Sequence, residues 1–596
     1  MKCYIKDYPR PQFVRNNWEN LNGTWDFCFD DKNKGEREKW YQNWEGDLKI
    51  QVPFSYETKM SGIGDETAHE NVWYSRTLVI EKEKLRENRY MLHFEGSDFI
   101  TKVWLNGQFV GSHKGGYTRF SFDLTDVAVD GENFLVVKVE DSFDMQQPRG
   151  KQRWMDESYT CFYVQTTGIW KTVWSEYVPN YSIKYVKMTP NLNDSCIELE
   201  YELNVPVGCK GFTIEAEVSF KDEFVNKVSV ASVSTYVKTK VDLQRNDDIN
   251  YKYAVRLWTP KTPQLYDIKF TLKENDKVWD EVGSYFGMRE IHIRGSRIMY
   301  NERELFQRLI LDQGYWKDSH LTPPSEEALI EDIDKIFELG YNGLRKHQKI
   351  EDERFFYWCD VKGMLVWCEA PSAYQFTDYA VNEFATEWMD IVKQHYNHPS
   401  VITWTPFNES WGVNMIRQNR AEQHFTEAIY YLTKTFDTMR PVIVNDGWEH
   451  TISDILTLHD YSENGDEVSQ RYTEFKDEIL NNEVTCCHAR LAFAEGYEYK
   501  GQPVMLTEFG GIAFNNDDSG WGYGKKVQGQ EDFIRRFDSI TTAFGQLQYM
   551  CGYCYTQVTD VQQEMNGLMD IDRNFKVDPK VIKEINDRQK RGRNCF

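Results

Sequence analysis

The feature that most constrains the fold is a change of pattern near residue 300. Before it, short runs such as Ile197–Leu203 and Phe212–Val218 alternate apolar and polar residues, which is typical of strands with one buried face. After it, short apolar runs alternate with segments of helical periodicity, such as Ser325–Leu339. A chain with this order of patterns is expected to carry β-sandwiches first and an α/β domain last.

The first part of the chain predicts two sandwiches. Asn106-Gly107 lies between two apolar runs and predicts a hairpin turn. Short, evenly spaced strand patterns over residues 1–179 predict a jelly-roll β-sandwich. Residues 180–289 repeat the all-β pattern at a length that suits an immunoglobulin-like β-sandwich.

Residues 290–596 predict a TIM barrel, because eight strand candidates recur between helical segments. The candidates are Leu305–Ile310, Gly343–Arg345, Met364–Trp367, Val401–Thr405, Pro441–Val444, Ile455–Leu458, Pro503–Leu506 and Tyr553–Tyr555. Catalytic residues of this fold lie at the carboxyl ends of the strands. Polar residues that follow the candidates are therefore the first to consider.

Two glutamates follow such strands. Glu409 comes after the fourth candidate, in Asn408-Glu409-Ser410, and Glu508 comes after the seventh. Strands four and seven face each other across an eight-stranded barrel, so we expect the two carboxylates to converge. A pair about 5 Å apart is the arrangement of retaining glycoside hydrolysis, with one nucleophile and one acid/base. Asn408 is then expected to hydrogen-bond the sugar 2-hydroxyl.

These residues resemble glycoside hydrolase family 2, the group of β-galactosidases, β-glucuronidases and β-mannosidases, and the resemblance covers nearly the whole chain. In the barrel it rests on Asn342–His347, Asn397–Ser400, Asn408–Ser410 and Thr507–Gly510. In the sandwiches it rests on Leu21–Trp25, Val103–Gly111, Gly168–Trp170 and Leu257–Pro260. The family has the same order of jelly roll, immunoglobulin-like domain and TIM barrel.

The resemblance implies a role for each matching residue. Glu409 matches the family acid/base and Glu508 the nucleophile. Tyr461 matches the tyrosine that hydrogen-bonds the nucleophile. Arg345 matches an arginine that steadies the nucleophile region, and His347 a histidine that binds sugar hydroxyls. From the residues alone, the favoured interpretations are an ordinary barrel ion pair for Arg345 and a core histidine for His347.

Some positions depart from the family pattern. Metal-dependent β-galactosidases carry a carboxylate and a histidine after strand three, whereas Cys368–Gln375 contains no histidine. We therefore predict no metal ion and no cofactor, and Glu369 either lines the pocket or braces a loop. Asp312, after strand one, is a candidate for contacts with sugar hydroxyls. Cys486-Cys487-His488 is only a weak zinc pattern.

The region after strand eight bears on which sugar is bound. β-Glucuronidases carry an Asn-x-Lys pair there that binds the sugar carboxylate. Asn566 aligns with this pair, but the lysine is absent and Glu564 would repel a uronate. Among the aromatic residues at strand ends, Trp448 and Tyr555 are expected to line the pocket, because rings cover the apolar faces of sugars.

The resulting prediction is a retaining exo-β-glycosidase without a cofactor. Terminal β-D-galactosides are the first expected substrates, with β-glucuronides as the alternative and β-glucosides and α-L-arabinopyranosides behind them. A carbohydrate-binding protein on an inactive barrel is the non-enzyme alternative, and the two intact carboxylates argue against it. A third alternative is a scaffold whose β-domains bind a protein.

Charge and hydropathy limit the partners and the location. A formal net charge of −24 disfavours nucleic acid and anionic membranes. No apolar stretch is long enough to span a bilayer, and the first residues lack the apolar core of a secretion signal. We therefore expect a cytoplasmic protein that acts on small glycosides. Relatives in the family often form dimers or tetramers, so a homo-oligomer is one candidate state.

Overall fold

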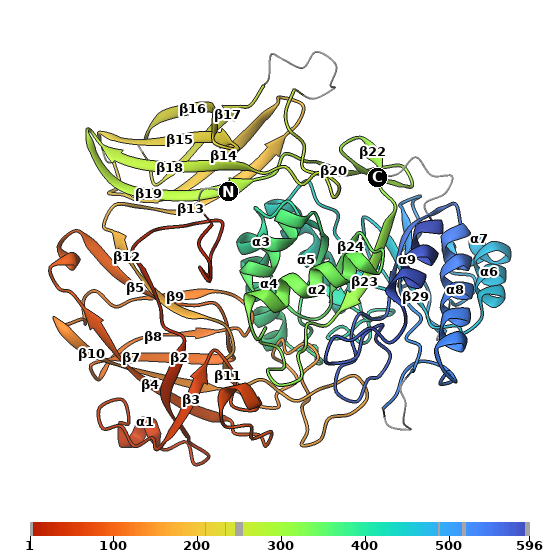
Figure 1. Ribbon diagram of the computed structural model, residues 1–596, viewed down its shortest axis with the longest axis horizontal. Helices are drawn as coiled ribbons and strands as arrows, with labels where there is room; N and C mark the ends of the chain where they lie inside the picture. Colours follow the sequence, from red (N-terminus) through yellow and green to blue (C-terminus); the bar gives the residue numbers. More distant parts are fainter. Residues whose placement is uncertain are drawn as a thin grey trace.

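A computed structural model describes residues 4–208, 210–232, 234–244, 254–486, 489–514 and 520–589. Figure 1 shows three parts: a red and orange sandwich, a yellow-green sandwich above it, and an α/β barrel in green to blue beside both. The predicted fold class, a jelly-roll sandwich, an immunoglobulin-like sandwich and a C-terminal TIM barrel, is confirmed.

The first sandwich packs two antiparallel sheets around an apolar core. Its six-stranded sheet has the order β3 (Leu48–Val52), β2 (Gly23–Phe29), β4 (Asn71–Ile80), β10 (Gly131–Glu140), β7 (Ile100–Leu105) and β8 (Gln108–Lys114). Its four-stranded sheet has the order β1 (Trp18–Asn20), β12 (Val173–Pro179), β5 (Asn88–Phe94) and β9 (Phe120–Asp123). The short pieces are α1 (Gly35–Glu38), η1 (Lys59–Ser61), η2 (Lys84–Arg86), β6 (Ser97–Asp98) and β11 (Gly168–Ile169). The predicted hairpin at Asn106-Gly107 joins β7 to β8, and both residues have the positive φ that such a turn needs.

The second sandwich follows the period-two pattern of its sequence. Along Phe212–Phe220 every other side chain is buried, because alternate residues of a strand point to opposite faces. One sheet contains β13 (Ser182–Asn191), β14 (Cys196–Asn204) and β17 (Tyr236–Asp242). The other contains β16 (Glu223–Ser232), β15 (Phe212–Phe220), β18 (Tyr266–Glu274) and β19 (Lys277–Phe286). A small sheet of β20 (Ile291–Arg294), β21 (Arg297–Tyr300) and β22 (Arg303–Glu304) leads into the barrel.

Seven parallel strands form most of the barrel wall. Their order is β26 (Val401–Thr405), β25 (Leu365–Glu369), β24 (Gly343–Lys346), β23 (Gln307–Asp312), β31 (Met550–Tyr555), β30 (Val504–Phe509) and β29 (Leu456–Asp460). The prediction of a regular fifth strand over Pro441–Val444 is wrong. Val442 forms a single bridge to Trp404, and the N–H groups of Val442 and Val444 donate to Asp454 and Ser453. Regular pairing resumes only between β27 (Phe407–Asn408) and β28 (Asn445–Asp446).

Helices cover the outside of the barrel (Figure 1). They are α2 (Glu326–Glu338), α3 (Glu353–Lys362), α4 (Asp378–His395), α5 (Arg420–Phe436), α6 (Gly465–Glu474), α7 (Lys476–Leu480), α8 (Gln530–Gln546) and α9 (Pro579–Arg588). Strand residues alternate between two apolar clusters. The cluster inside the barrel includes Leu309, Leu311, Trp367, Ile402, Ile455, Met505 and Cys554. The cluster against the helices includes Ile310, Val366, Val401, Leu456, Leu506 and Tyr555. Within the described residues, no helix has the length and apolarity needed to cross a membrane.

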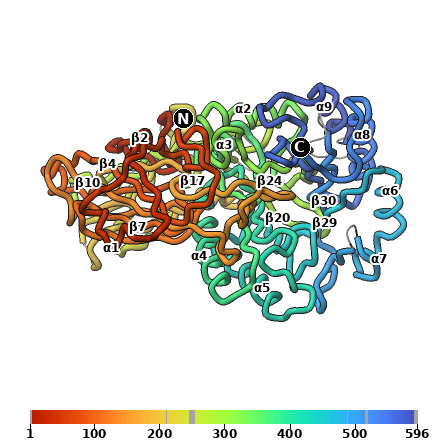
Figure 2. Tube along the Cα trace, turned by 90° about the horizontal axis from the view of Figure 1, so that it is seen from below, coloured from red at the N-terminus to blue at the C-terminus, as the bar shows by residue number. Residues whose placement is uncertain are grey.

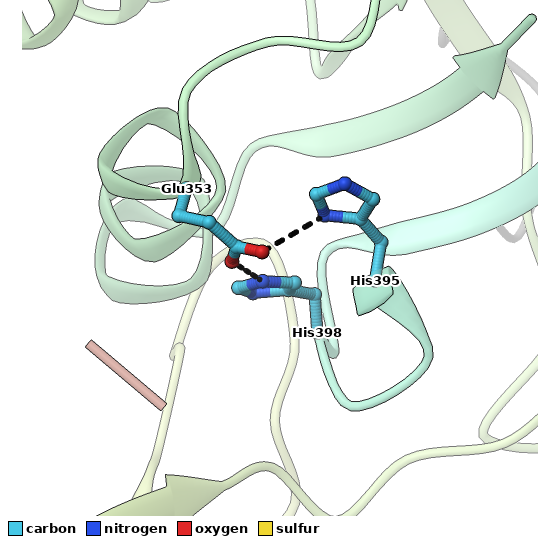
Figure 3. Close-up of side chains that lie close together, drawn as sticks. All are labelled: Glu353, His395 and His398. Carbon is cyan, nitrogen blue, oxygen red and sulfur yellow. Dashed lines mark hydrogen bonds and ion pairs between the residues drawn. The ribbon is translucent and has the colours of Figure 1, made fainter. Parts of the chain in front are cut away.

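A buried charged cluster lies where the first sandwich meets the barrel. His398 contacts Asp360 through Nδ1 at 2.6 Å. Its Nε2 lies 3.1 Å from Glu353, and Nδ1 of His395 lies 3.7 Å from the same carboxylate (Figure 3). The spacing of Glu353, His395 and His398 would suit a metal ion. However, Arg119 of the first sandwich donates to the same carboxylate at 2.7 Å, so the cluster already holds a cation as an ion-pair network.

His398→Gln is expected to destabilise the protein by roughly 3 kcal/mol near pH 6 and by less at higher pH. Burial alone would lower the pKa of His398, but Asp360 and Glu353 raise it from 6.5 to about 9. A raised pKa in the folded state means that this stabilisation is fully present below pH 6.5 and is lost as the pH rises through about 9. Urea unfolding of both proteins at three pH values measures the difference. If the difference in unfolding free energy between the two proteins did not change with pH, His398 would have to be a neutral imidazole in the folded protein.

Candidate active site

Both predicted glutamates lie at the carboxyl ends of barrel strands. Glu508 belongs to β30, and Glu409 follows β27 in a turn where Glu409 and Ser410 have φ of 49° and 58°. The Glu409 N–H donates to the Asp446 carbonyl at 3.0 Å, which fixes this turn. One oxygen of each carboxylate lies within 4.8 Å of the other. That spacing corresponds to the close pair of a retaining glycosidase.

Donors occupy both oxygens of the Glu508 carboxylate. Nη1 of Arg345 donates to Oε1 at 3.0 Å, and the Tyr461 hydroxyl donates to Oε2 at 2.5 Å. The ring of Tyr523 stacks on Tyr461 with 3.4 Å between ring centroids and holds that hydroxyl in place. These two hydrogen bonds fix the orientation of the Glu508 carboxylate at the end of β30.

Arg345 connects several parts of the site. Its guanidinium is fully buried and also bonds Glu369 (2.6 Å), Asp446 (2.8 Å) and the Oδ1 atom of Asn408 (2.6 Å). The pKa of Arg345 rises, because the surrounding carboxylates outweigh the effect of burial. Nδ2 of Asn408 is buried and has no partner among the described residues, so this donor is available for a ligand.

Glu369 braces two of the predicted site residues. One of its oxygens accepts from Arg345, and the other lies 2.8 Å from Nδ1 of His347 and accepts from the Gln348 N–H. Burial and the positive charge of Lys151 lower the pKa of His347, so its imidazole is neutral. A neutral imidazole held by a carboxylate can exchange hydrogen bonds with sugar hydroxyls.

His459 joins the two glutamates. Its Nδ1 lies 2.8 Å from Glu409 Oε1 and 3.6 Å from Glu508 Oε2, and its Nε2 lies 3.2 Å from Asp446. Burial opposes the charged form, but these three carboxylates raise the pKa of His459 to about 10. Burial would raise the pKa of Glu409, but the hydrogen bond and charge of His459, with the charges of Lys151 and Arg345, lower it. These opposite shifts favour an ion pair in which His459 carries the proton of the hydrogen bond to Glu409.

Lys151, a charged residue near this site, belongs to the first sandwich. The segment between β10 and β11, residues 141–167, is here called the insert, and Figure 2 shows its orange trace reaching over the barrel. Arg149 N–H donates to the Ser372 carbonyl at 3.0 Å, and Tyr374 hydroxyl donates to the Gly150 carbonyl at 2.6 Å. Lys151 follows and is 7% exposed, with Nζ 3.3 Å from the Cys161 sulfur.

Lys151 is held in its charged form. Burial would lower the pKa of Lys151, but Cys161, Glu409, Glu564 and Glu508 raise it. The charges of both predicted catalytic carboxylates thus act on this ammonium group. The sequence carried no recognisable signal for this residue, because it lies in an irregular segment of another domain.

Asn566 and Trp448 are the next two predicted site residues. Asn566 donates to Glu564 (3.0 Å) and accepts from Gln557 (2.7 Å), and burial raises the pKa of Glu564. Tyr163 of the insert hydrogen-bonds the same glutamate, so this cluster also joins the two domains. Trp448 is partly exposed, and the guanidinium carbon of Arg490 lies 3.5 Å from the centroid of its ring.

Two candidates lie on the helix side of the wall. Tyr555 packs against Phe509 and Phe537 in the outer cluster, since the neighbouring Cys554 takes the inward position. Asp312 bonds Lys346 at 2.6 Å. Among the described residues, no contact joins either side chain to Glu409 or Glu508. Strand alternation turns both side chains away from the barrel interior, so the structure does not bring these two predicted site residues to the glutamates.

The signal for His459 was present in the sequence. It stands two residues before Tyr461, and residues at that spacing on a strand share a face. Asp446 had no comparable signal because its strand is only two residues long. The weak zinc pattern at Cys486 cannot be compared, because Cys487 and His488 lie outside the described residues.

Three family models match the chain in the order of its domains. They are "Glycosyl hydrolases family 2, sugar binding domain" over residues 18–174, "Glycosyl hydrolases family 2" over 181–289, and "Glycosyl hydrolases family 2, TIM barrel domain" over 291–590.

Curated relatives carry two different names. A putative β-glucuronidase of Formosa agariphila is 26% identical and covers 68% of this chain and 47% of its own length. A β-galactosidase of Thermoanaerobacter pseudethanolicus is 26% identical, with 76% and 61% covered. A β-glucuronidase of Paenibacillus borealis is 23% identical, with 90% and 89% covered. The chain thus spans about half the length of the first relative.

Solved structures agree with the fold. A β-glucuronidase from Ruminococcus gnavus, in complex with an N1-substituted uronic isofagomine, superposes with a TM-score of 0.78 at 18% identity. The match covers 98% of this chain and 99% of that one. At this identity the likeness establishes the fold.

Proposed function

The chain belongs to glycosyl hydrolase family 2, and from that premise we propose that it is a retaining exo-β-glycosidase that uses Glu508 as nucleophile and Glu409 as acid/base. The observation that carries the proposal is the approach of the two carboxylates, with one oxygen of each within 4.8 Å. A close pair of carboxylates is typical of retaining enzymes, whereas inverting enzymes hold theirs farther apart to admit a water.

The geometry supports a double displacement. Glu508 attacks the anomeric carbon, the bond to the leaving oxygen breaks, and Glu409 gives that oxygen its proton. After this first step, the sugar is bound to Glu508 as a glycosyl ester. Water then attacks the same carbon and loses a proton to Glu409, which frees Glu508 and restores the starting configuration. Asn408 Nδ2 is the donor proposed for the sugar 2-hydroxyl.

Terminal β-D-galactosides remain the first proposed substrates. The loop after β31 contains Asn566 and Glu564. Leu568 occupies the position where the Asn-x-Lys pair of β-glucuronidases has its lysine. Glu564 bonded to Asn566 is an acceptor for a neutral sugar's hydroxyls. β-Glucosides and α-L-arabinopyranosides remain behind it, and the binding protein without catalysis remains the non-enzyme alternative.

β-D-Glucuronides are the second candidate, and one observation favours them. Lys151 brings a buried ammonium group to the carboxylate pair from the other domain. An ammonium is a suitable partner for a uronate. Burial also raises the pKa of Glu564, which weakens the repulsion expected from that side chain.

Initial rates on aryl β-galactoside, β-glucuronide, β-glucoside and α-L-arabinopyranoside, with and without a chelator, test these proposals. In Lys151→Met, glucuronide turnover is expected to fall about 50-fold relative to galactoside, because a charged hydrogen bond is lost. Lys151→Arg keeps the charge and serves as the control. An unchanged ratio would rule out Lys151 as a uronate ligand. A wild-type enzyme that turns over no glycoside would contradict the proposed function, and a rate loss with chelator would contradict the prediction of no metal.

A further inference from the structure

Tyr523 lies close to the proposed nucleophile, in a short irregular segment between β30 and α8. Its ring stacks on that of Tyr461, with 3.4 Å between the ring centroids and 6° between the ring planes. Gly511 has a φ of 53° and allows this approach, because a Cβ atom there would lie 2.3 Å from Cδ2 of Tyr523. The Tyr461 hydroxyl donates to Oε2 of Glu508 at 2.5 Å. A single ring therefore separates Tyr523 from a group that contacts the nucleophile.

Backbone hydrogen bonds fix the segment that carries Tyr523. The Tyr523 N–H donates to the Gly511 carbonyl at 2.7 Å, just beyond the end of β30. The backbone N–H of Trp521 donates to the Gln563 carbonyl at 2.9 Å, one residue before Glu564. The segment is thus held between the strand that carries the proposed nucleophile and the loop after β31.

The charges of the site act on the Tyr523 hydroxyl. Burial raises the pKa of Tyr523, and so do three carboxylates, those of Glu409, Glu508 and Glu564. Burial and then the charges of Glu508 and Tyr523 raise the pKa of Tyr461. The Tyr523 phenol is therefore neutral, and a neutral phenol both donates and accepts hydrogen bonds. Among the described residues, none forms a hydrogen bond with this hydroxyl, so the group is available to a ligand.

The two oxygens of Glu508 indicate which part of a sugar lies near Tyr523. Nη1 of Arg345 donates to Oε1 of Glu508, and Nη2 of the same guanidinium donates to Oδ1 of Asn408. The Asn408 amide proposed for the 2-hydroxyl is therefore on the Oε1 side, and C2 of the sugar lies there with it. The ring oxygen is the other ring neighbour of the anomeric carbon, so it lies with C5 on the Oε2 side. Tyr461, which donates to Oε2, and Tyr523 are on that side.

We propose that the Tyr523 hydroxyl binds the substituent on C5 of the terminal sugar and that it selects pyranosides in which this substituent is polar. The inference rests on the proposed function, because it takes Glu508 as the nucleophile. A hydroxymethyl group and a carboxylate can both hydrogen-bond a neutral phenol, whereas a methyl group or a hydrogen atom cannot. Tyr523 then favours hexosides and uronides over pentopyranosides and 6-deoxy sugars.

The test uses aryl β-D-galactoside, β-D-fucoside and α-L-arabinopyranoside, which differ only in the substituent on C5. Tyr523→Phe keeps the stacked ring and removes the hydroxyl. In this variant, kcat/KM for the galactoside is expected to fall about 10-fold, because one hydrogen bond is lost, with the other two substrates nearly unchanged. If the wild-type protein prefers glucuronides, the glucuronide and the xyloside form the same comparison. Tyr201→Phe removes a buried hydroxyl in the second sandwich and is the matched control, which should change none of these rates.

Two outcomes would overturn the proposal. Equal losses on all substrates would mean that Tyr523 only supports Tyr461, and Tyr461→Phe provides the reference for that pattern, since its contact with Glu508 is common to every substrate. No loss on any substrate would exclude the hydroxyl from sugar binding. Calorimetric binding of methyl β-D-galactoside and methyl α-L-arabinopyranoside to Glu508→Gln, with and without Tyr523→Phe, repeats the comparison without turnover. A wild-type protein that hydrolyses no glycoside, in which Tyr523→Phe still weakens only galactoside binding, would contradict the proposed function and keep this inference.

Discussion

Glu508→Gln is expected to lower turnover by roughly five orders of magnitude while the protein remains folded. The amide has the same shape as the carboxylate and can keep a contact with Tyr461, but its oxygen is too weak a nucleophile to form the glycosyl ester. Initial rates on an aryl glycoside measure the loss. Mass spectrometry of wild-type protein treated with a 2-deoxy-2-fluoroglycoside should place the label on the peptide that contains Glu508.

Glu409→Gln is the companion variant for this experiment. Its loss should be large for a glycoside with an alkyl leaving group and small for one with a dinitrophenolate leaving group, which departs without a proton. The nucleophile variant should lose both equally. If Glu508→Gln retained more than about 1% of wild-type turnover, another residue would have to be the nucleophile.

His459→Asn is expected to lower kcat about 1,000-fold and to move the alkaline limb of the pH profile to lower pH. In the wild-type protein the Glu409–His459 pair keeps a proton until the pH approaches the raised pKa of His459, about 10. Without the imidazole, Glu409 must hold that proton alone, and a carboxyl group loses it several pH units earlier. The profile of kcat against pH, measured for both proteins, tests this.

His450→Asn is the control for this change. His450 is also buried and lies near the same strand, but burial lowers its pKa to about 4 and it contacts Thr457 rather than either glutamate. We expect this variant to keep the wild-type profile. If His459→Asn also kept it, His459 would be only a structural support for the loop.

The sequence was sufficient for the parts that follow from local periodicity. Alternation predicted the strands of both sandwiches, and apolar runs between helical segments predicted the barrel. The same pattern indicated which strand ends meet, so Glu409 and Glu508 were predicted to converge. The fifth barrel strand is shorter than predicted: it keeps backbone hydrogen bonds to Trp404, but the N–H groups of Val442 and Val444 donate to the side chains of Asp454 and Ser453, contacts that periodicity does not reveal.

Side-chain direction and contacts between domains were harder to predict. Tyr555 and Asp312 follow or end predicted strands, but a boundary error of one residue reverses the face on which a side chain lies. The position of Lys151 could not be predicted, because a strand pattern does not show where the side chains of a long irregular connection will lie. Tyr461 was predicted from its motif, whereas His459, two residues earlier, was not predicted as a site residue.

The insert also bears on how this protein can change. Lys151 and Tyr163 belong to this one connection, residues 141–167, whereas Glu409 and Glu508 belong to the barrel. The two proposed catalytic carboxylates and part of their surroundings are therefore encoded in separate stretches of the chain. Variation in this connection between related proteins is expected to alter the surroundings of the carboxylates while the carboxylates themselves are kept.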